Sequence, residues 1–177
     1  AVNVSAVNLL EPDFCAHVLA RLRAHGLAPD ALAIEITESA LMSNRALAAA
    51  TLEALTAGGV QLAIDDFGTG YSSLAYLQSV PAQVIKIDQS FVTDLDTDER
   101  KRALVATVIK LSHDLGQLVV AEGVETAPVA SFLAGAGCDQ VQGYLYARPM
   151  APGEFEEWIC AEWTLARPRG ARQVAYA

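Results

Sequence analysis

Short apolar segments alternate with amphipathic segments along the chain, and this alternation constrains the fold more than any other feature of the sequence. The apolar segments have the length of strands, and we expect six, at Val2–Ser5, Leu32–Thr37, Leu62–Asp65, Val84–Asp88, Leu118–Glu122 and Gln140–Leu145. Residues at helical spacing predict helices between and after them, at about 12–25, 47–57, 72–77, 97–115, 129–133 and 155–163. Such alternation predicts a parallel sheet with crossover helices.

The pattern inside the strands favours a barrel over an open, doubly wound sheet. Polar residues such as Glu35, Lys86 and Glu122 alternate with apolar neighbours such as Ile34 and Ile36. Central strands of a doubly wound sheet are apolar on both faces, whereas a barrel with its site at the carboxyl ends of the strands needs polar groups there. Because a complete barrel needs about 250 residues, we expect an incomplete (β/α)8 barrel of the TIM type. It would lack its first strand–helix unit and could have a short extra strand near 146–150.

Composition and charge exclude several classes of protein. The chain is 53% hydrophobic and carries a net charge of −9, which supports a buried core and makes nucleic-acid polymers poor partners. No apolar run is long enough to insert this segment into a membrane. Its three cysteines have no CxxC spacing and suggest a reducing, cytoplasmic location. We expect one domain over 1–165 and a disordered tail over 166–177.

Five oxygen-bearing side chains fall at predicted strand ends: Asn3, Glu35, Asp65, Asp66 and Glu122. Any one of these residues alone is an ordinary surface group, but in a barrel they converge at one mouth. Clustered carboxylates raise one another's pKa values, and a hard cation such as Mg²⁺ or Mn²⁺ relieves that repulsion. The set therefore predicts a metal site.

Two further polar residues on the inward side have two interpretations each. Lys86 either pairs with a barrel carboxylate or stabilises an attacking hydroxide and the phosphoryl charge, and the two roles are compatible. Gln142 is either a buried hydrogen-bonding amide or part of the site. The tripeptide Asp66–Gly68 also occurs in protein kinases, but the chain has no GxGxxG or HRD motif.

Several segments resemble the EAL family of cyclic di-GMP phosphodiesterases, in the family's order. They are VNVS (2–5), LAIEITES (32–39), AIDDFGTGYSSLAYL (63–77), VIKIDQSFV (84–92), VVAEGVET (119–126) and QGYLYARPM (142–150). The resemblance implies a TIM barrel that hydrolyses cyclic di-GMP to linear pGpG with two Mg²⁺ or Mn²⁺ ions. Asn3, Glu35 and Asp65 match metal ligands, and Asp66 matches a ligand of the second metal. Glu122 matches a carboxylate that holds a metal or activates water.

The resemblance also assigns residues around the metals. Lys86 matches a lysine that contacts the nucleophilic water, and Gln142 matches a pocket residue near the metals. Glu38 resembles a glutamate that supports the loop after Asp66, and Glu125 resembles a supporting carboxylate. Asp88 and Pro149, within matched segments, are placed with the residues that bind or support the substrate. The loop itself comprises Phe67, Gly68, Thr69 and Gly70.

One departure from the family pattern concerns the Glu-Ala-Leu motif of the family's first strand. This motif is absent before Asn3, and the similar letters at 52–55 fall on a predicted helix. We therefore expect the full-length protein to continue upstream, with a GGDEF or sensor domain. Any membrane tether of the full-length protein is expected in domains outside this segment. A homodimer formed through the barrel is also expected. The alternative function is a receptor that binds cyclic di-GMP without cutting it.

The missing motif predicts weak or no turnover by this chain alone, because one metal ligand is not supplied. A displacement of about 1 Å in the reacting groups can lower the rate roughly 10²-fold. The measurement is pGpG formation at saturating Mn²⁺, with and without the native upstream segment. Equal rates would contradict the prediction and would mean that Glu38 or Glu125 fills the ligand position.

Overall fold

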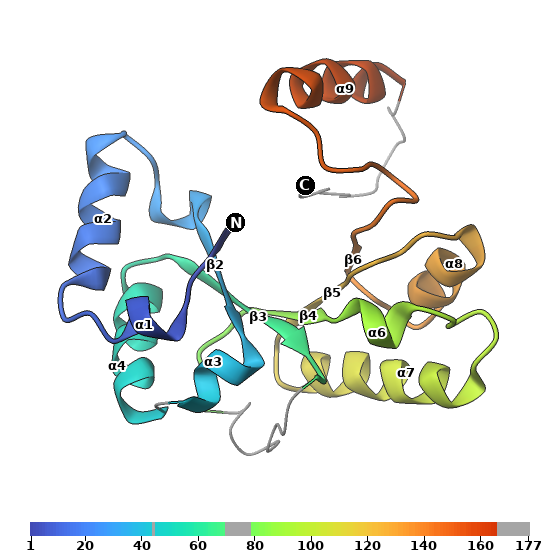
Figure 1. Ribbon diagram of the computed structural model, residues 1–177, viewed down its shortest axis with the longest axis horizontal. Coiled ribbons are helices and arrows are strands. Elements are labelled where there is room, and N and C mark those ends of the chain that lie inside the picture. Colours follow the sequence, from blue (N-terminus) through green and yellow to red (C-terminus); the bar gives the residue numbers. More distant parts are fainter. Residues whose placement is uncertain (44, 70–78, 166–177) are drawn as a thin grey trace.

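The computed structural model describes residues 1–43, 45–69 and 79–165 and contains a six-stranded sheet (Figure 1). The strands are β1 (Val2–Asn3), β2 (Ala33–Thr37), β3 (Gln61–Phe67), β4 (Val84–Ile87), β5 (Leu118–Ala121) and β6 (Gln140–Val141). All neighbouring strands are parallel, and their order in the sheet is their order in the chain. This is the order of a barrel; the order in a doubly wound sheet reverses at a switch point.

The six predicted strands are confirmed, although β1 and β6 are shorter than expected. The extra strand near 146–150 was a wrong prediction, because that segment contains no strand. In the described part of the chain the outer edges of β1 and β6 have no strand partner, so the sheet does not close. The fold is thus an incomplete barrel.

Helices separate successive strands as the crossover topology requires, and α9 comes after the last strand. They are α1 (Ala6–Leu9), α2 (Phe14–Ala24), the 3-10 turn η1 (Pro29–Ala31), α3 (Glu38–Ser43), α4 (Arg45–Ala57), α6 (Gln89–Val92), α7 (Glu99–Asp114), α8 (Ala127–Gly135) and α9 (Pro152–Leu165). The sequence did not predict the short helices α1, α3 and α6. The Glu-Ala-Leu letters at 52–55 lie on α4, as expected. The helix expected at 72–77 and the tail at 166–177 lie outside the described residues.

The two faces of the sheet differ in polarity, as the alternating pattern predicted. Ile34, Ile85 and Val119 lie on the face covered by helices and are fully buried. Glu35 and Lys86 point to the opposite face. One core cluster forms between β2, β3, α2 and α4 and a second between β4, β5, α7 and α8, and Val108 of α7 packs against both. The helices therefore stabilise the sheet from one side only.

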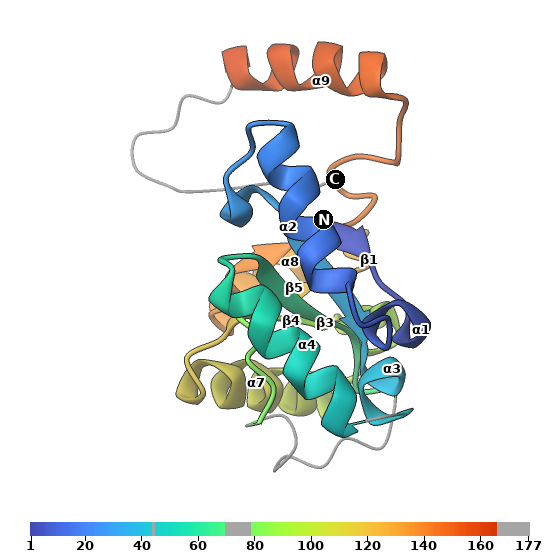
Figure 2. The same ribbon diagram turned by 90° about the vertical axis from the view of Figure 1, so that its left-hand side faces the viewer.

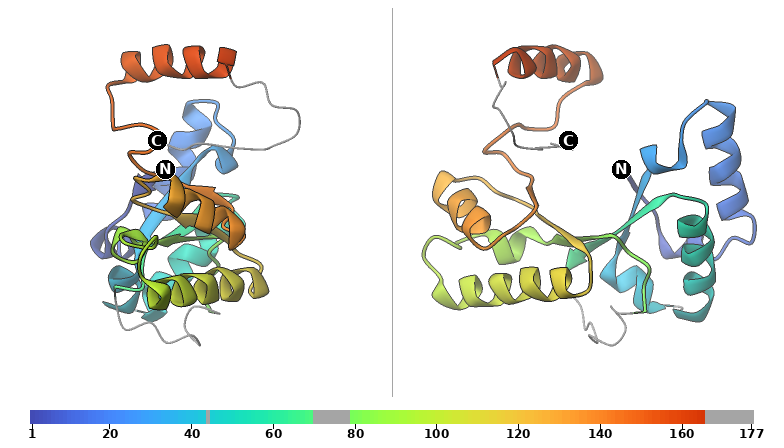
Figure 3. Two further views of the ribbon diagram at one scale, coloured as in Figure 1. Left: turned by 90° about the vertical axis from the view of Figure 1, so that its right-hand side faces the viewer. Right: turned by 180° about the vertical axis from the view of Figure 1, so that it is seen from behind.

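The helices follow one another around the outside of the sheet. In Figure 1, α2, α4, α7 and α8 surround the strands, and α9 stands apart above the open side. Figure 2 shows the same separation of α9 from a second direction. The view from behind in Figure 3 shows α7 beneath the strands and α2 and α8 at opposite ends of the arc. The polar face of the sheet is thus the one that the crossover helices leave uncovered.

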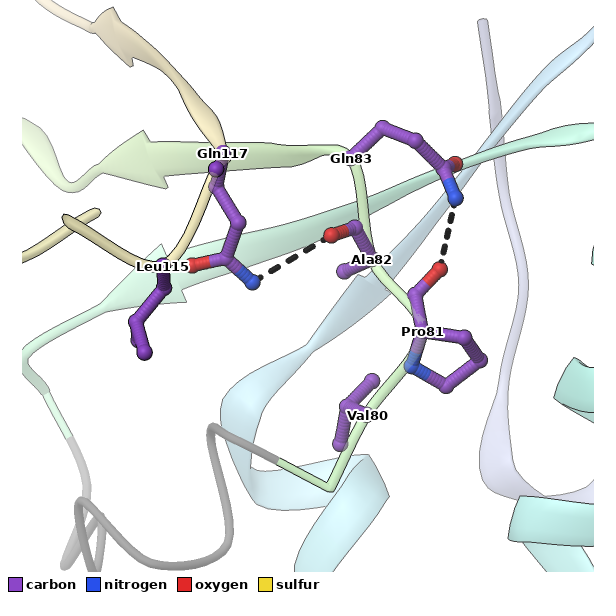
Figure 4. A pocket seen from close by; sticks show the side chains of 7 residues that line it. Val80, Pro81, Ala82, Gln83, Leu115 and Gln117 are labelled. Carbon is purple, nitrogen blue, oxygen red and sulfur yellow. Dashed lines mark hydrogen bonds between the residues drawn. The ribbon is translucent and has the colours of Figure 1, made fainter. Parts of the chain in front are cut away.

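The amino ends of β4 and β5 carry a hollow of about 340 Å³, shown in Figure 4. Two amide side chains make hydrogen bonds to backbone carbonyl groups there. Gln83 Nε2 donates to the carbonyl oxygen of Pro81 at 2.7 Å, and Gln117 Nε2 donates to that of Ala82 at 3.2 Å. None of the predicted site residues lines this hollow. In parallel barrels this end contributes to stability and the opposite end carries the site.

Replacing Ile85 with alanine should destabilise the domain, because this side chain lies in the centre of the sheet and is 0% exposed. We expect a loss of about 2–5 kcal/mol, the usual cost of an Ile→Ala cavity. Leu104→Ala on α7 is the matched control: Leu104 is 46% exposed, and we expect a change within about 0.5 kcal/mol. Urea unfolding measures both, and equal midpoints would contradict this assignment of the core.

Candidate metal centre

Lys86 of β4 lies at the centre of a group of carboxylates from three other strand ends. Its Nζ is 2.9 Å from Glu35 Oε2, 3.1 Å from Asp65 Oδ1 and 2.7 Å from Glu122 Oε1. The Lys86 side chain is only 8% exposed, and its three partners are 12–20% exposed. One positive charge thus faces three negative charges in a largely dehydrated place, which leaves an excess of negative charge.

A β-bulge in β3 brings two adjacent aspartates to the same place. Ile64 pairs with Ile85 and Phe67 pairs with Ile87, so Asp65 and Asp66 together stand opposite Lys86 alone. Adjacent residues of a regular strand point to opposite faces. A bulge with a left-handed residue removes this restriction, and Asp66 has φ 53°. The Asp66 N–H also donates to Asp65 Oδ1 at 3.0 Å, which fixes the first carboxylate.

The carboxylates of Asp65, Asp66 and Glu122 form a compact group of possible metal ligands. One oxygen from each lies within 4.8 Å of the others. Hard cations such as Mg²⁺ and Mn²⁺ prefer oxygen ligands of this kind, so the donor set fits such an ion. Glu35 is linked to this group by the hydrogen bond that its Oε2 accepts from Lys86 Nζ. Asn3 is in register with Glu35 on the neighbouring strand and is exposed.

Electrostatics in this group favour an additional positive charge. Burial raises the pKa of Glu122, and its hydrogen bond to Lys86 offsets this effect only in part. Burial also raises the pKa of Asp66, and the charges of Asp65 and Asp88 raise it further. Burial by itself would lower the pKa of Lys86, but its hydrogen bonds to Glu122 and Glu35 outweigh burial and raise that pKa. Lys86 therefore stays charged, and the carboxylates are the groups that protons and metal ions compete for.

The loop after Asp66 is held by a buried glutamate. Glu38, the first residue of α3, is 3% exposed, and its Oε2 accepts the Gly68 N–H at 2.9 Å. Its Oε1 is buried and makes no hydrogen bond among the described residues. Thr69 donates two hydrogen bonds to the Asp66 carbonyl oxygen, from its N–H at 3.2 Å and from its Oγ1 at 2.9 Å. Phe67 is buried, and Gly70 lies outside the described residues.

The other predicted site residues are not part of this carboxylate group. Asp88 caps α6 by accepting the Ser90 N–H at 3.0 Å. Glu125, Gln142 and Pro149 are exposed beyond β5 and β6, and no hydrogen bond described for the chain joins their side chains to the carboxylates. Gln142 lies one residue beyond the end of β6, where its N–H donates to Ala121 and its carbonyl oxygen accepts from Val124.

Two residues that the sequence did not single out contact the loops of the site. Phe91 lies against Gly68, and Gln89 lies against Gly123. The available signal was a glycine two residues after Asp66 and another directly after Glu122. Glycine at such a place often marks a close approach of another part of the chain.

A family model described as "EAL domain" matches residues 1–149. The chain belongs to the EAL domain family. Cyclic di-GMP phosphodiesterase NbdA of Pseudomonas aeruginosa is 43% identical over 161 residues, which are 91% of this chain and 21% of that protein. This chain spans about a fifth of the length of the curated relatives it matches.

Solved structures of proteins in complex with cyclic di-GMP have the same fold. The Pseudomonas aeruginosa MucR phosphodiesterase, in complex with cyclic di-GMP, matches with a TM-score of 0.82 and 41% identity, over 87% of this chain and 62% of that one. A manganese and cyclic di-GMP complex of Klebsiella pneumoniae BlrP1 matches with a TM-score of 0.79 and 39% identity, over 84% and 38%. The predicted TIM-type fold is thereby confirmed. No helix in the described part of this EAL domain could span a membrane.

The carboxylate group predicts Mn²⁺ binding that depends on Asp65 and Asp66. Replacing both with asparagine should lower the affinity about tenfold or more, since even outer-shell changes typically cost 10–100-fold. The control is Glu156→Gln with Glu157→Gln, which removes the same charge from exposed positions on α9. Calorimetric titration with Mn²⁺ measures all three proteins, and equal affinities would contradict the assignment.

The same titration has a predicted pH dependence. Because the pKa values of Asp66 and Glu122 are raised, both groups take up protons at a higher pH than ordinary carboxylates, whose pKa values are about 4. Mn²⁺ affinity should therefore fall as the pH is lowered, beginning above that range, with protons released on binding.

Proposed function

We propose that this EAL domain is the catalytic part of an enzyme that hydrolyses one phosphodiester bond of cyclic di-GMP and forms linear pGpG. The observation that carries the proposal is the group of Asp65, Asp66 and Glu122 around the buried Lys86. Relatives named as cyclic di-GMP phosphodiesterases support the choice of substrate. The reaction class follows from the hard-cation ligands, which suit hydrolysis at phosphorus.

The proposed cofactors are two Mg²⁺ or Mn²⁺ ions. Asp65, Asp66 and Glu122 would hold them, with Glu35 and Asn3 supplying further oxygens from the neighbouring strands. When bound, such ions polarise the phosphate and lower the pKa of water. A further ligand would come from the glutamate of the family's first-strand motif, which this sequence does not contain.

Glu122 and Lys86 are the proposed catalytic residues beside the metal ligands. A water oxygen attacks phosphorus, the bond from phosphorus to ribose O3′ breaks, and O3′ takes up a proton. Glu122 accepts the proton of the attacking water, and its raised pKa suits that role. Lys86 stays cationic and stabilises the negative charge that develops on the phosphoryl oxygens. Asp66, in the bulge of β3, is the third proposed catalytic residue and is also a proposed metal ligand.

The surrounding residues have proposed supporting roles. Glu38 holds the loop that follows Asp66, through its bond to Gly68. We assign Asp88, Glu125, Gln142 and Pro149 to binding or supporting the substrate at the rim of the site. In the full-length protein we propose a homodimer through the barrel, an upstream GGDEF or sensor domain, and a cytoplasmic site of action.

Replacing Glu122 with glutamine in the full-length protein should reduce hydrolysis strongly and leave cyclic di-GMP binding largely intact. A general base contributes about 10²–10⁴-fold, and the interaction is made mainly in the transition state, so kcat falls and KM does not rise. Glu157→Gln on α9 is the control. The measurements are pGpG formation and cyclic di-GMP binding.

Two outcomes of that experiment would change the proposal. A Glu122→Gln protein that keeps more than about a tenth of the wild-type turnover would remove Glu122 from the proton transfer. A wild-type protein that binds cyclic di-GMP with metal present and never forms pGpG would be a receptor, and not an enzyme.

A further inference from the structure

The carboxylates of the candidate metal centre must reach across an intervening strand. Asp65 and Asp66 are on β3 and Glu122 follows β5, while β4 lies between these strands. Strands are about 4.8 Å apart, so β3 and β5 are separated by roughly 10 Å at the backbone. The ligand oxygens nevertheless lie within 4.8 Å of one another. A small change in the separation of the two segments would therefore change the distances between the ligand oxygens directly.

Pairing with β4 holds both ligand segments as far as Ile87, and the loops that follow them continue beyond this last pairing. The Glu122 N–H donates to the carbonyl oxygen of Ile87 at 3.1 Å, and Ile87 is the last residue of β4. The chain then enters α6, which continues from β4 between the two loops. The loop after Asp66 contacts α6 at Gly68, and the turn that carries Glu122 contacts α6 at Gly123.

The first contact joins α6 to the loop after Asp66. A Cβ built on Gly68 would lie 2.6 Å from Cε2 of the Phe91 ring, closer than real Cβ atoms approach. Gly68 also has φ +102°, a conformation that favours glycine. The Phe91 ring therefore lies directly on the backbone of the loop that follows the two aspartates.

The second contact joins α6 to the turn that carries Glu122. A Cβ on Gly123 would lie 2.5 Å from Cβ of Gln89, and Gly123 has φ +67°. The other side of this turn is also occupied, because Gly143 packs against the backbone of Val124 and Val124 donates its N–H to Gln142 at 3.0 Å. The turn cannot move away from α6 to absorb an added side-chain atom.

The helix α6 is short, but three interactions fix it in place. Asp88 caps its first turn, and the side chain of Val92 is 1% exposed. Lys101 of α7 donates from Nζ to the carbonyl oxygens of Ser90 at 3.0 Å and Thr93 at 2.8 Å. This tethers the carboxyl end of α6 to a long helix of the core.

We infer that Gln89 and Phe91 are positioning residues that set the distance between the end of β3, which carries Asp65 and Asp66, and the turn that carries Glu122. They act through their contacts with Gly68 and Gly123. Metal affinity and kcat both depend on that distance. The part of the inference that concerns kcat rests on the proposed function, whereas the part that concerns metal affinity does not.

The test uses Gly123→Ala in the full-length protein, with Mn²⁺ calorimetry as the first readout. The added Cβ clashes with Gln89, and we expect an affinity loss of about tenfold or more. Gly26→Ala is the matched control: Gly26 has nearly the same φ, +66°, but nothing lies within 4 Å of an added Cβ. It carries the same backbone strain and should bind Mn²⁺ within about twofold of wild type.

The double variant Gly123→Ala with Gln89→Gly separates steric contact from backbone strain. It keeps the strained alanine and removes the Cβ that the alanine meets, so most of the lost affinity should return. Contacting residues show such coupling, whereas independent sites add. Failure of this rescue, or equal Mn²⁺ affinities for Gly123→Ala and Gly26→Ala, would overturn the inference.

A second arm tests Phe91 against an aromatic residue of the same core. Phe91 and Phe132 are both partly buried and pack against the same hydrophobic cluster, but Phe132 lies on α8 beneath Arg102. Both alanine variants should lower Tm. Only Phe91→Ala should also weaken Mn²⁺ binding and lower kcat without raising KM. If Phe132→Ala weakens Mn²⁺ binding equally, Phe91 is merely structural.

These readouts separate the inference from the proposed function. If the wild type binds Mn²⁺ and forms no pGpG, the proposed function fails, and the calorimetric series still decides whether α6 positions the ligands. If the wild type hydrolyses cyclic di-GMP and Gly123→Ala keeps the wild-type Mn²⁺ affinity and kcat, the positioning role fails while the proposed function stands.

Discussion

The ammonium group of Lys86 is the interaction on which the site depends. It stands on the polar face of the central strand β4 and makes ion pairs with carboxylates from β2, β3 and the end of β5. Burying several carboxylates without such a partner would be very costly. One cation is too few for this group, however, because Glu122 and Asp66 still have raised pKa values. The remaining negative charge makes the group suitable for a divalent ion.

The architecture above Lys86 follows from the need to bring distant carboxylates together. The bulge in β3 directs Asp65 and Asp66 to one side, at the cost of a left-handed conformation at Asp66. Glu38 and α6 support the loop that follows, the first by a hydrogen bond and the second by the Phe91 ring. The covered face needs no such devices, because apolar packing against the helices determines its geometry.

Local sequence signals were sufficient for the strands and the long helices, and insufficient for the short connecting elements. The period-two pattern of β2 and β4 specifies which side chains face the helices. The extra strand predicted near 146–150 fails because the chain turns at Gly143: the Tyr146 N–H donates to the Gly143 carbonyl oxygen at 3.0 Å. Hydrophobic alternation alone does not reveal such a turn. Helices of four residues, such as α6, are likewise too short to produce a helical period.

The sequence by itself determined the family, the class of fold and the polar face on which the site lies, because these depend on residue type and on periods along the chain. It also identified Asp65, Asp66 and Glu122 as candidate ligands. Only the tertiary structure decided that these three carboxylates form the compact group, that Gln142 is exposed, and that Phe91 and Gln89 contact the loops. Those results depend on one bulge, one turn and two glycine contacts between segments far apart in the sequence, and no local pattern encodes distances across strands.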